Sequence, residues 1–383
     1  MLWTPEEVMQ RALTLARRCR GRTAPNPPVG AVLQSSQGEV IGEGSHQVAG
    51  SPHAEVCAIE DALKRTPVKE LRGSTLTVTL EPCNHYGKTP PCSKRIVEAG
   101  IKKVVYSVRD PHKEASGGTE YLRAQGIEVI SGVLEREGKE LIAPFAKWAL
   151  EGRPLVHLKW AQSLDGKISA KKGERTQISG AGLIGHLHEL RSRVDGILIG
   201  GNTQRIDDPL LTVRLPNQSP HHPMRVVFTQ SGKLNLEGNV FCSHEGGRTL
   251  VFSLRKINAS HEGPHKVDFF SLERELEDSL TSQKFLFWAL KKLAMDFSIQ
   301  ELLVESGGGL ALELLEENLV DKISTFLSPI WIGDEGTEAL KGKPFLGGGR
   351  SLFSEFRIEK FGEDVLIEGC VSGSWYESWL SES

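Results

Sequence analysis

The chain has 383 residues, of which 39% are apolar and 25% charged, values typical of a folded globular protein with room for two or three domains. Its formal net charge of −3 provides no overall basic field, so the composition does not require a nucleic-acid partner. The sequence contains no run of eighteen apolar residues, which argues against a transmembrane helix.

The six cysteines, at positions 19, 57, 83, 92, 242 and 370, are too few and too scattered for a disulfide-stabilised scaffold. The N-terminus lacks a basic region followed by an apolar one, which is the pattern of a secretory signal. We therefore expect a reduced, cytoplasmic protein. Cys19, Cys57, Cys242 and Cys370 are expected to be small core residues.

Helices and strands alternate along the first part of the chain. Thr4, Pro5 and Glu7 form a capping box that opens a predicted helix over 5–20. After a proline-rich turn at 25–28, periodicity predicts strands near 29–34, 39–43, 75–80, 103–108 and 127–131, and helices at 53–65, 92–99, 117–125 and from about 135. This alternation predicts an α/β fold, a three-layer α/β/α sandwich around a mixed sheet.

A histidine, a glutamate and two cysteines within this part indicate a catalytic metal. His53 precedes Glu55 by two residues, Cys83 follows a proline at the end of the 75–80 strand, and Cys92 opens the next predicted helix. One imidazole and two thiolates leave a fourth tetrahedral position of zinc open for water. Bound zinc lowers the pKa of such a water to about 7, and Glu55 is close enough to move its protons. The set is the ligand and base pattern of zinc-dependent deaminases.

The spacing between the two cysteines departs from the common deaminase pattern. Eight residues separate Cys83 from Cys92, where two are usual. The loop at 84–89 offers amide, imidazole and ammonium groups that could hold a substrate phosphate. Two alternatives remain open: the three residues could be ordinary buried side chains, or the metal could be purely structural. Glu55, and the lack of a fourth cysteine or histidine in the pattern, favour a catalytic zinc.

A domain boundary is predicted near 146–153, where Gly152 and Pro154 follow a helical stretch. We place a zinc-dependent deaminase domain at residues 1–147 and a second domain at residues 148–383. The second domain is predicted to have strands at 155–161, 196–201, 225–229, 249–253, 302–305, 323–331 and 364–371, and helices at 181–193 and 310–317. Residues 254–284 are polar and weakly patterned, and we expect a loop there with at most a helix.

The predicted strand at 302–305 runs into Gly307, Gly308 and Gly309, and a helix follows directly. Such a turn lets backbone N–H groups approach a phosphate at a helix N-terminus. A bare tight turn explains the glycines equally well. Because no Gly-x-Gly-x-x-Gly motif occurs in a strand–helix context, a standard dinucleotide-binding fold is not predicted.

Three stretches of the N-terminal half carry a family resemblance: Thr23-Ala24-Pro25-Asn26-Pro27-Pro28-Val29-Gly30, Gly42-Glu43-Gly44-Ser45-His46 and Ala49-Gly50-Ser51-Pro52-His53-Ala54-Glu55. Together with the Cys83 loop, they resemble the deaminase half of the bifunctional riboflavin-biosynthesis deaminase/reductase. The resemblance implies a cytidine-deaminase-like fold. It also implies that Asn26 and His46 line the pyrimidine pocket and that the long loop faces the ribose phosphate.

The C-terminal half has matching motifs in Leu158-Lys159-Trp160-Ala161-Gln162-Ser163-Leu164-Asp165-Gly166-Lys167, at Leu190-Arg191, from Thr203 to Arg214, and in Val304-Glu305-Ser306-Gly307-Gly308. These look like the reductase half of the same enzyme, which has a dihydrofolate-reductase-like α/β fold. The resemblance implies NADPH at Ala161, Gln177, Thr203, Asp207, Thr229, Gly307, Gly308 and Gly309, and substrate at Arg175, Arg191, Leu211, Arg214 and Glu305. Two of these, Arg191 and Arg214, could bind a ribose phosphate bidentately.

Three positions depart from the family pattern. Arg175 and Gln177 stand where the family usually has a serine and a tryptophan, and Thr229 ends its predicted strand where an acidic residue is common. These departures concern contacts in the second domain and leave the zinc pattern intact.

The combined interpretation is a bifunctional enzyme with zinc and NADPH as cofactors. It would deaminate 2,5-diamino-6-ribosylamino-4(3H)-pyrimidinone 5′-phosphate and then reduce the ribosyl chain to give 5-amino-6-ribitylaminouracil 5′-phosphate. The expected partner is a phosphorylated pyrimidine, and neither nucleic acid nor a membrane is expected to bind. A homo-oligomer is possible because the family often assembles. Alternatives are a nucleic-acid base deaminase with an accessory domain, and a C-terminal half that has lost catalysis and only binds.

Overall fold

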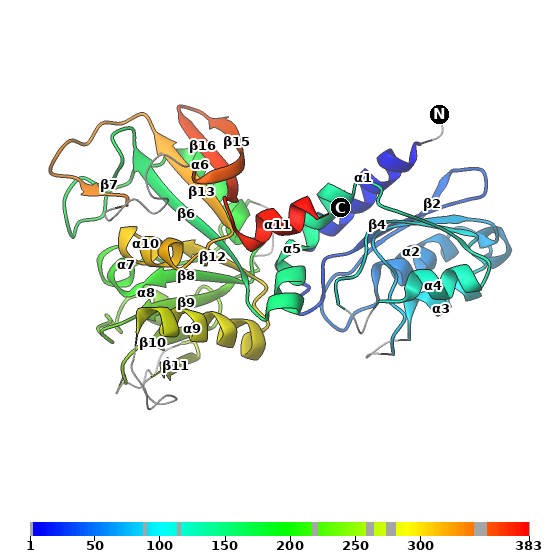
Figure 1. The fold of residues 1–383 in the computed structure, drawn as a ribbon, viewed down its shortest axis with the longest axis horizontal. Coiled ribbons are helices and arrows are strands. Elements are labelled where there is room, and N and C mark those ends of the chain that lie inside the picture. The colour runs from blue at the N-terminus through cyan, green and yellow to red at the C-terminus, as the bar shows by residue number, and fades with distance from the viewer. Residues whose placement is uncertain are drawn as a thin grey trace. The chain divides into compact units, whose positions relative to one another are not determined.

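The computed structural model describes residues 3–86, 90–112, 116–216, 221–257, 264–272, 281–340 and 351–382. It divides into two compact units, residues 1–151 and 152–383 (Figure 1). Within the described ranges, none of the helices combines the length and the apolar character needed to span a bilayer.

The first unit is built around a mixed sheet with the strand order β2-β1-β3-β4-β5. β1 is antiparallel to both of its neighbours, whereas β3, β4 and β5 are parallel. The strands are β1 (Gly30–Gln34), β2 (Val40–Ser45), β3 (Thr75–Leu80), β4 (Lys103–Val108) and β5 (Glu128–Ser131). The helices are α1 (Pro5–Arg17), α2 (Ala54–Leu63), the 3-10 turn η1 (Val68–Leu71), α3 (Cys92–Glu98), α4 (Gly118–Ala124) and α5 (Glu135–Glu151).

Helices cover both faces of this sheet, as the alternation along the strands predicts. Ala31 and Leu33 of β1 pack with α2, α3 and α4 in one apolar core. The alternate residues of β1 face the other way, and one of them, Gly30, lies against Ala12 of α1. α1 also contacts α5, which packs on β4. The predicted three-layer arrangement is therefore confirmed.

The second unit has a nine-stranded sheet with the order β11-β10-β9-β8-β12-β6-β13-β16-β15. The pairs from β11 to β13 are all parallel, and β16 and β15 are added antiparallel at one end. The strands are β6 (Leu155–Ser163), β8 (Gly196–Gly200), β9 (Met224–Thr229), β10 (Thr249–Ser253), β11 (Val267–Ser271), β12 (Glu301–Glu305), β13 (Lys322–Ser328), β15 (Phe353–Phe361) and β16 (Asp364–Val371). A separate antiparallel pair joins β7 (Lys167–Ser169) to β14 (Thr337–Glu338).

The helices of this unit bury the two faces of the large sheet. They are α6 (Ala181–Arg191), α7 (Gly201–Ile206), α8 (Asn239–Cys242), α9 (Ser282–Phe297), α10 (Gly308–Glu316) and α11 (Trp375–Ser381). α9 and α10 pack in one core with Leu198 and Leu302, whereas α6 and α8 pack in the other with Ile197 and Leu303. Because neighbouring strand residues point to opposite faces, the central residues of β8, β10 and β12 are consecutively apolar, as in buried parallel strands.

Several predicted boundaries and elements were wrong. The first helix ends at Arg17 rather than 20, and the range 254–284 contains the strand β11. α9, α11 and β15 were missed. β15 is exposed along most of its length, and the alternation of Phe356 and Ile358 with charged residues is the signal that could have found it. Among the four cysteines expected in the core, Cys19 and Cys370 are buried, Cys57 is partly exposed and Cys242 is exposed.

Candidate active sites

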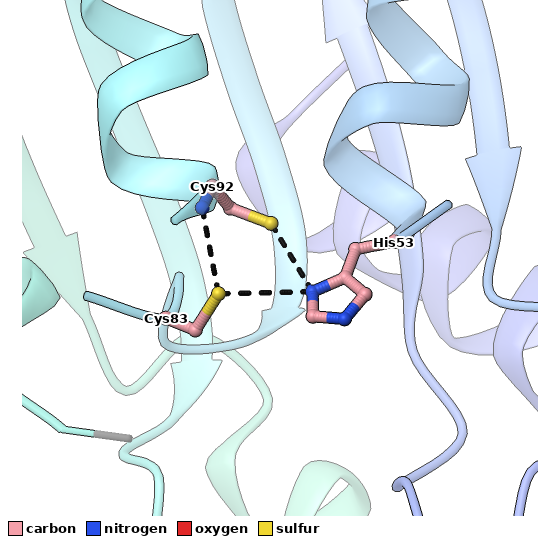
Figure 2. Close-up of side chains that lie close together, drawn as sticks. All are labelled: His53, Cys83 and Cys92. Carbon is pink, nitrogen blue, oxygen red and sulfur yellow. Dashed lines mark hydrogen bonds between the residues drawn. The ribbon is translucent and has the colours of Figure 1, made fainter. Parts of the chain in front are cut away.

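The three predicted metal ligands come together from three elements of the first unit. His53 is the N-cap residue of α2, Cys83 follows β3, and Cys92 is the first residue of α3. Their ligand atoms all lie within 4.8 Å of one another. Figure 2 shows His53 Nδ1 facing both sulfurs, at 3.2 Å from Cys92 Sγ and 3.7 Å from Cys83 Sγ.

This donor set fits a tetrahedral zinc ion. Zinc bonds of about 2.0–2.1 Å to nitrogen and 2.3 Å to sulfur place the two donor atoms about 3.5 Å apart. The observed separations lie on either side of that value. Within the described residues the cluster has three members, so the fourth position of the metal is left to water or substrate.

The surroundings favour a thiolate at Cys83. The backbone N–H of Cys92 donates to Cys83 Sγ at 3.4 Å, drawn as a dashed line in Figure 2. The pKa of Cys83 is lowered because Cys92 and His53 donate hydrogen bonds to its sulfur, despite the opposing effect of burial. A thiolate is the form that binds zinc. Folding thus prepares the sulfur for the metal.

Glu55, the predicted acid–base residue, lies in the first turn of α2 and is only 4% exposed. Burial and the negative charge of Cys83 raise the pKa of Glu55 to about 7, against the opposing influence of His53. A carboxyl group whose pKa lies near neutrality can both take and return a proton. Glu55 therefore has the environment that general acid–base chemistry requires.

A cavity of about 360 Å³ opens onto these residues. Asn26 and His46, predicted to line a pyrimidine pocket, are on its wall together with His53 and Glu55. His46 Nδ1 lies 3.2 Å from the carbonyl of Pro52, and its Nε2 lies 3.0 Å from Asn26 Nδ2. The carbonyl can only accept, so Nδ1 carries the proton and Nε2 accepts from the Asn26 amide. The amide oxygen of Asn26 is thereby kept as an acceptor for a ligand.

The structure adds two wall residues that sequence patterns did not single out. Phe145 and Trp148 reach the cavity from α5, far along the chain, whereas His85 on the wall belongs to the cysteine loop that the sequence had indicated. Residues 87–89 of that loop lie outside the described part of the chain, so the prediction that it faces a ribose phosphate stays a prediction. No local motif marks Phe145 or Trp148, because a single helical aromatic residue looks like any core residue.

Asp110, in the loop after β4, also lines this cavity. Burial raises the pKa of Asp110 to about 6. Its position is set by Glu81, which accepts from the backbone N–H groups of Asp110 at 3.4 Å and of Thr119 at 2.9 Å. Glu81 thus ties the loop after β4 to the first turn of α4.

A second cavity, of about 750 Å³, lies at the carboxyl ends of β6, β8, β9 and β12. This is the usual position of ligand sites in parallel sheets. The predicted contact residues on its wall are Ala161, Arg175, Gln177, Arg191, Thr203, Asp207, Leu211, Thr229, Glu305, Gly307, Gly308 and Gly309. The departures at Arg175, Gln177 and Thr229 are therefore placed where a ligand would meet them.

Two arginines differ from the arrangement that was predicted for them. The Arg191 guanidinium forms a bidentate pair with Glu305, with Nε–Oε1 at 2.7 Å and Nη2–Oε2 at 2.8 Å, and Nη1 donates to the carbonyl of Thr212 at 3.0 Å. Its fork is thus occupied by a carboxylate. Arg214 is exposed, donates to Thr212 Oγ1 at 2.8 Å, and is not on the described wall of the cavity. That the two arginines bind a ribose phosphate together stays a prediction.

Lys159, which belongs to the motif at 158–167, is also on the wall of the second cavity. It lies on β6 beside Glu305 of β12, to which it is the Cα partner across the ladder. Its ammonium lies over the Phe326 ring, 4.4 Å from the centroid. Burial lowers the pKa of Lys159 to about 8, with Arg191 lowering it further and Glu305 opposing. A lysine of this kind can exchange a proton near neutral pH.

The glycine run has two different structural roles. Gly307 is the N-cap of α10, and a Cβ at Gly309 would meet open space, so the backbone there is accessible to a ligand. At Gly308, however, a Cβ would lie 2.4 Å from the carbonyl oxygen of Ala339. Close packing of the backbone alone therefore explains the middle glycine.

Comparison with known proteins matches both units. Residues 3–108 match the model of the cytidine and deoxycytidylate deaminase zinc-binding region, and residues 154–367 match that of the RibD C-terminal domain. The riboflavin biosynthesis protein RibD of Aquifex aeolicus is 36% identical over 368 residues, which cover 94% of this chain and 96% of that protein. The RibD protein of a Synechocystis species is 36% identical over 369 residues and covers 96% of each chain.

Solved structures show the same correspondence. The structure of a diaminohydroxyphosphoribosylaminopyrimidine deaminase/5-amino-6-(5-phosphoribosylamino)uracil reductase from Thermotoga maritima has a TM-score of 0.79 and 37% identity, covering 95% of this chain and 97% of that one. RibD of Acinetobacter baumannii has a TM-score of 0.78 and 28% identity, covering 96% of this chain and 98% of that one.

Proposed function

Because this chain belongs to the RibD family of bifunctional riboflavin-biosynthesis deaminase/reductases, we propose which residues perform its two reactions and on which compounds. The family assignment confirms the cytidine-deaminase-like and dihydrofolate-reductase-like folds, and zinc and NADPH as the cofactors. We propose that the two cavities act on the compounds named for the Thermotoga relative. The first would take a diaminopyrimidine ribosylamine phosphate and the second the deaminated uracil compound.

In the first cavity, His53, Cys83 and Cys92 hold the zinc. When bound, the metal supplies a Lewis acid that makes a water nucleophilic at neutral pH. Glu55 would carry both protons of the attacking water: one to the ring nitrogen as the new carbon–oxygen bond forms, and the other to the amino group as the carbon–nitrogen bond breaks and ammonia leaves. Asn26, held by His46, presents its amide oxygen to donors of the pyrimidine. The observation that carries this proposal is the buried Glu55 carboxyl, which lines the same cavity as His53 and Cys83 of the three-residue donor cluster.

In the second cavity, Lys159 and Glu305 are proposed to serve the reduction of the ribosyl group. NADPH, when bound, supplies a hydride. Reduction places that hydride on C1′ of the ribosyl carbon chain, breaks the bond from C1′ to the ring oxygen, and requires one proton on that oxygen. The Lys159 ammonium, whose pKa is lowered to about 8 by burial, is the proposed proton donor. Glu305 fixes Arg191 and keeps a negative charge beside Lys159.

The decisive experiment follows NADPH oxidation after addition of the diaminopyrimidine ribosylamine phosphate, in wild type and in Glu55→Ala. We expect oxidation in wild type, its loss in the variant, and its return when the deaminated uracil compound is supplied instead. Ammonia release without NADPH oxidation would leave the deaminase and contradict the reductase assignment. If the zinc-loaded, folded protein releases no ammonia and oxidises no NADPH with either compound, the proposed substrates are wrong.

The partner is a small pyrimidine, and we propose that the chain needs neither nucleic acid nor membrane. The enclosed size of the first cavity, about 360 Å³, supports a mononucleotide-sized ligand. The free cysteines agree with a reducing, cytoplasmic location. A homo-oligomer is also proposed, since β15 ends the sheet with Phe356 57% and Ile358 64% exposed. Light scattering of the purified protein tests that last point directly.

A further inference from the structure

One end of the second cavity contains a group of polar side chains, of which only Thr229 was predicted to contact the cofactor. Arg205 and Asn202 of α7 lie there with Thr229 and Ser231, at the carboxyl ends of β8 and β9. A Cβ placed on Gly201 would lie 3.1 Å from Thr229 Oγ1 and 3.5 Å from Arg205 Nη1. The threonine hydroxyl and the guanidinium therefore lie close to one another beside Gly201.

The place of this group along the sheet indicates which part of a ligand it meets. Lys159 and Glu305, the groups proposed for the chemistry, are on β6 and β12. The strand order continues from β6 through β12 and β8 to β9, so the Arg205 group is at the opposite end of the cavity. If the nicotinamide of the cofactor lies at the chemical end, its adenosine half extends toward β8 and β9. This step depends on the reductase function proposed above.

Arg205 is held in place yet retains capacity for a ligand. Its Nη1 donates to the carbonyl of Lys233 at 2.6 Å, and its Nη2 donates to Asn202 Oδ1. A guanidinium has five N–H groups in a planar fork, so these two bonds leave donors for a phosphate. Thr229 Oγ1 accepts from the N–H of Gly232 at 3.1 Å, which directs its own O–H elsewhere, as a donor.

One carboxylate that shares the cavity with this group has both oxygens engaged in hydrogen bonds within the chain. Glu313 also lines the cavity, and its oxygens accept from Gln230 Nε2 at 2.8 and 3.0 Å and from Ser282 Oγ at 2.7 Å. At the end of β9, Thr229 offers this site a neutral donor. A carboxylate at a strand end favours the ribose 2′-OH of NADH, whereas an arginine accommodates the 2′-phosphate of NADPH.

We propose that Arg205 and Thr229 bind the adenosine 2′-phosphate of NADPH and give the reductase its selectivity against NADH. Arg205 supplies a charge-assisted pair of hydrogen bonds, steadied by Asn202 and the Lys233 carbonyl. Thr229 supplies a hydroxyl donor and avoids the repulsion that a carboxylate would cause. The threonine departure then becomes part of the cofactor site.

The test measures binding of two fragments by calorimetry, independently of catalysis. Adenosine 2′,5′-bisphosphate has the 2′-phosphate and AMP lacks it. We expect wild type to bind the bisphosphate at least about tenfold more tightly than AMP. Arg205→Gln and Thr229→Asp should each bring that ratio toward one, and the ratio of KM values for NADH and NADPH should fall in parallel.

Arg193→Gln is the matched control, because Arg193 pairs with the exposed Glu189 outside the described wall of the cavity. It should keep the wild-type ratio. A wild-type protein that does not distinguish the two fragments would overturn the proposal, and so would variants that weaken both fragments equally. If the fragments are distinguished but wild type oxidises no NADPH with the uracil compound, the selectivity site stands and the proposed reductase chemistry fails.

Discussion

The two cavities differ in how their residues are brought together. In the first, His53 and Glu55 share one helical turn, and Cys83 and Cys92 flank one loop, so short motifs hold most of the chemistry. In the second, Lys159, Arg191 and Glu305 come from β6, α6 and β12, and only the order of strands in the sheet makes them neighbours. A metal site demands a compact donor set, whereas an extended cofactor spreads its contacts over several strand ends.

The two sites also manage buried charge differently. The cysteines and His53 form a donor cluster that a metal cation would stabilise, and Glu55 beside it has a raised pKa. In the second cavity Arg191 is paired with Glu305, and Lys159 beside them adds a further positive charge. The first cluster therefore depends on an added ion, whereas the Arg191–Glu305 pair is made within the chain. Each prediction below separates one site from the other.

Loss of the zinc chemistry should be the largest effect. His53→Ala should abolish both bound zinc and deamination, whereas Glu55→Gln should keep the zinc and lower the deamination rate by about 10²–10⁴-fold. Metal analysis and ammonia release measure the two quantities. Both variants should still reduce the deaminated uracil compound with NADPH, and the exposed Cys242→Ser serves as the control. Loss of zinc in Glu55→Gln would show that this residue is needed for metal binding.

The next largest effect is expected at Lys159. Lys159→Met should lower NADPH oxidation by about 10²-fold or more, because general acid catalysis typically contributes that much, and should leave ammonia release unchanged. The protonated lysine is the active form, and its pKa is lowered to about 8, so the wild-type reduction rate should fall as the pH rises above that value. A rate that instead rises through this range would exclude lysine as the acid.

A stability effect follows for the buried pair of Arg191 and Glu305, whose side chains are 9% and 12% exposed. Glu305→Gln leaves a buried guanidinium without its counter-charge and should cost about 3–5 kcal/mol in the free energy of unfolding of the second unit. Glu189→Gln, which removes an exposed partner of Arg193, should cost no more than about 1 kcal/mol. Urea titration measures both.

The same pair makes stability depend on pH in a definite direction. The pKa of Glu305 is lowered in the folded protein, since Arg191 and Lys159 outweigh the opposite effect of burial. The stabilisation is therefore complete above the unfolded pKa of a glutamate and is lost as the pH falls through the lower folded value. Glu305→Gln should flatten this part of the acid titration, and an unchanged slope would contradict the assignment.

The smallest effect is expected at the aromatic wall of the first cavity. Trp148→Ala removes an aromatic side chain from the cavity wall and should raise KM for deamination about two- to tenfold, as aromatic contacts of about 0.5–1.5 kcal/mol imply. NADPH-dependent reduction should not change. Trp331→Ala, at a side chain that is 75% exposed, is the control. Equal effects of the two variants would remove Trp148 from the site.

The sequence predicted the zinc cluster because its residues are tied to local features. A capping position, a Pro-Cys turn and a helix start are each set within a few residues, so spacing alone indicated the geometry of His53, Cys83 and Cys92. Asp110 and Trp148 could not be found this way. Asp110 reaches the cavity through Glu81, which lies twenty-nine positions away, and Trp148 arrives on a helix that packs across the sheet.

For the second cavity, family resemblance supplied the residues but not their partners. It named Arg191 and Glu305 as separate substrate contacts, and the structure shows them paired with each other. It grouped Arg214 with Arg191, but in the structure the Arg214 guanidinium donates a hydrogen bond to Thr212 Oγ1. Roles for Lys159 and Arg205 could be proposed only once the structure showed which side chains lie beside them. Hydrogen-bond partners more than a hundred residues apart leave no trace in local periodicity.

The sequence by itself determined the two-part organisation, the mixed α/β class of the first unit and the zinc donor set, since all of these follow from short-range patterns. Only the tertiary structure decided which charges pair, which glycine is needed for packing and which side chains reach a cavity. The reason is physical: periodicity and capping act over a few residues, whereas burial and pairing of charge depend on strands brought together from distant parts of the chain.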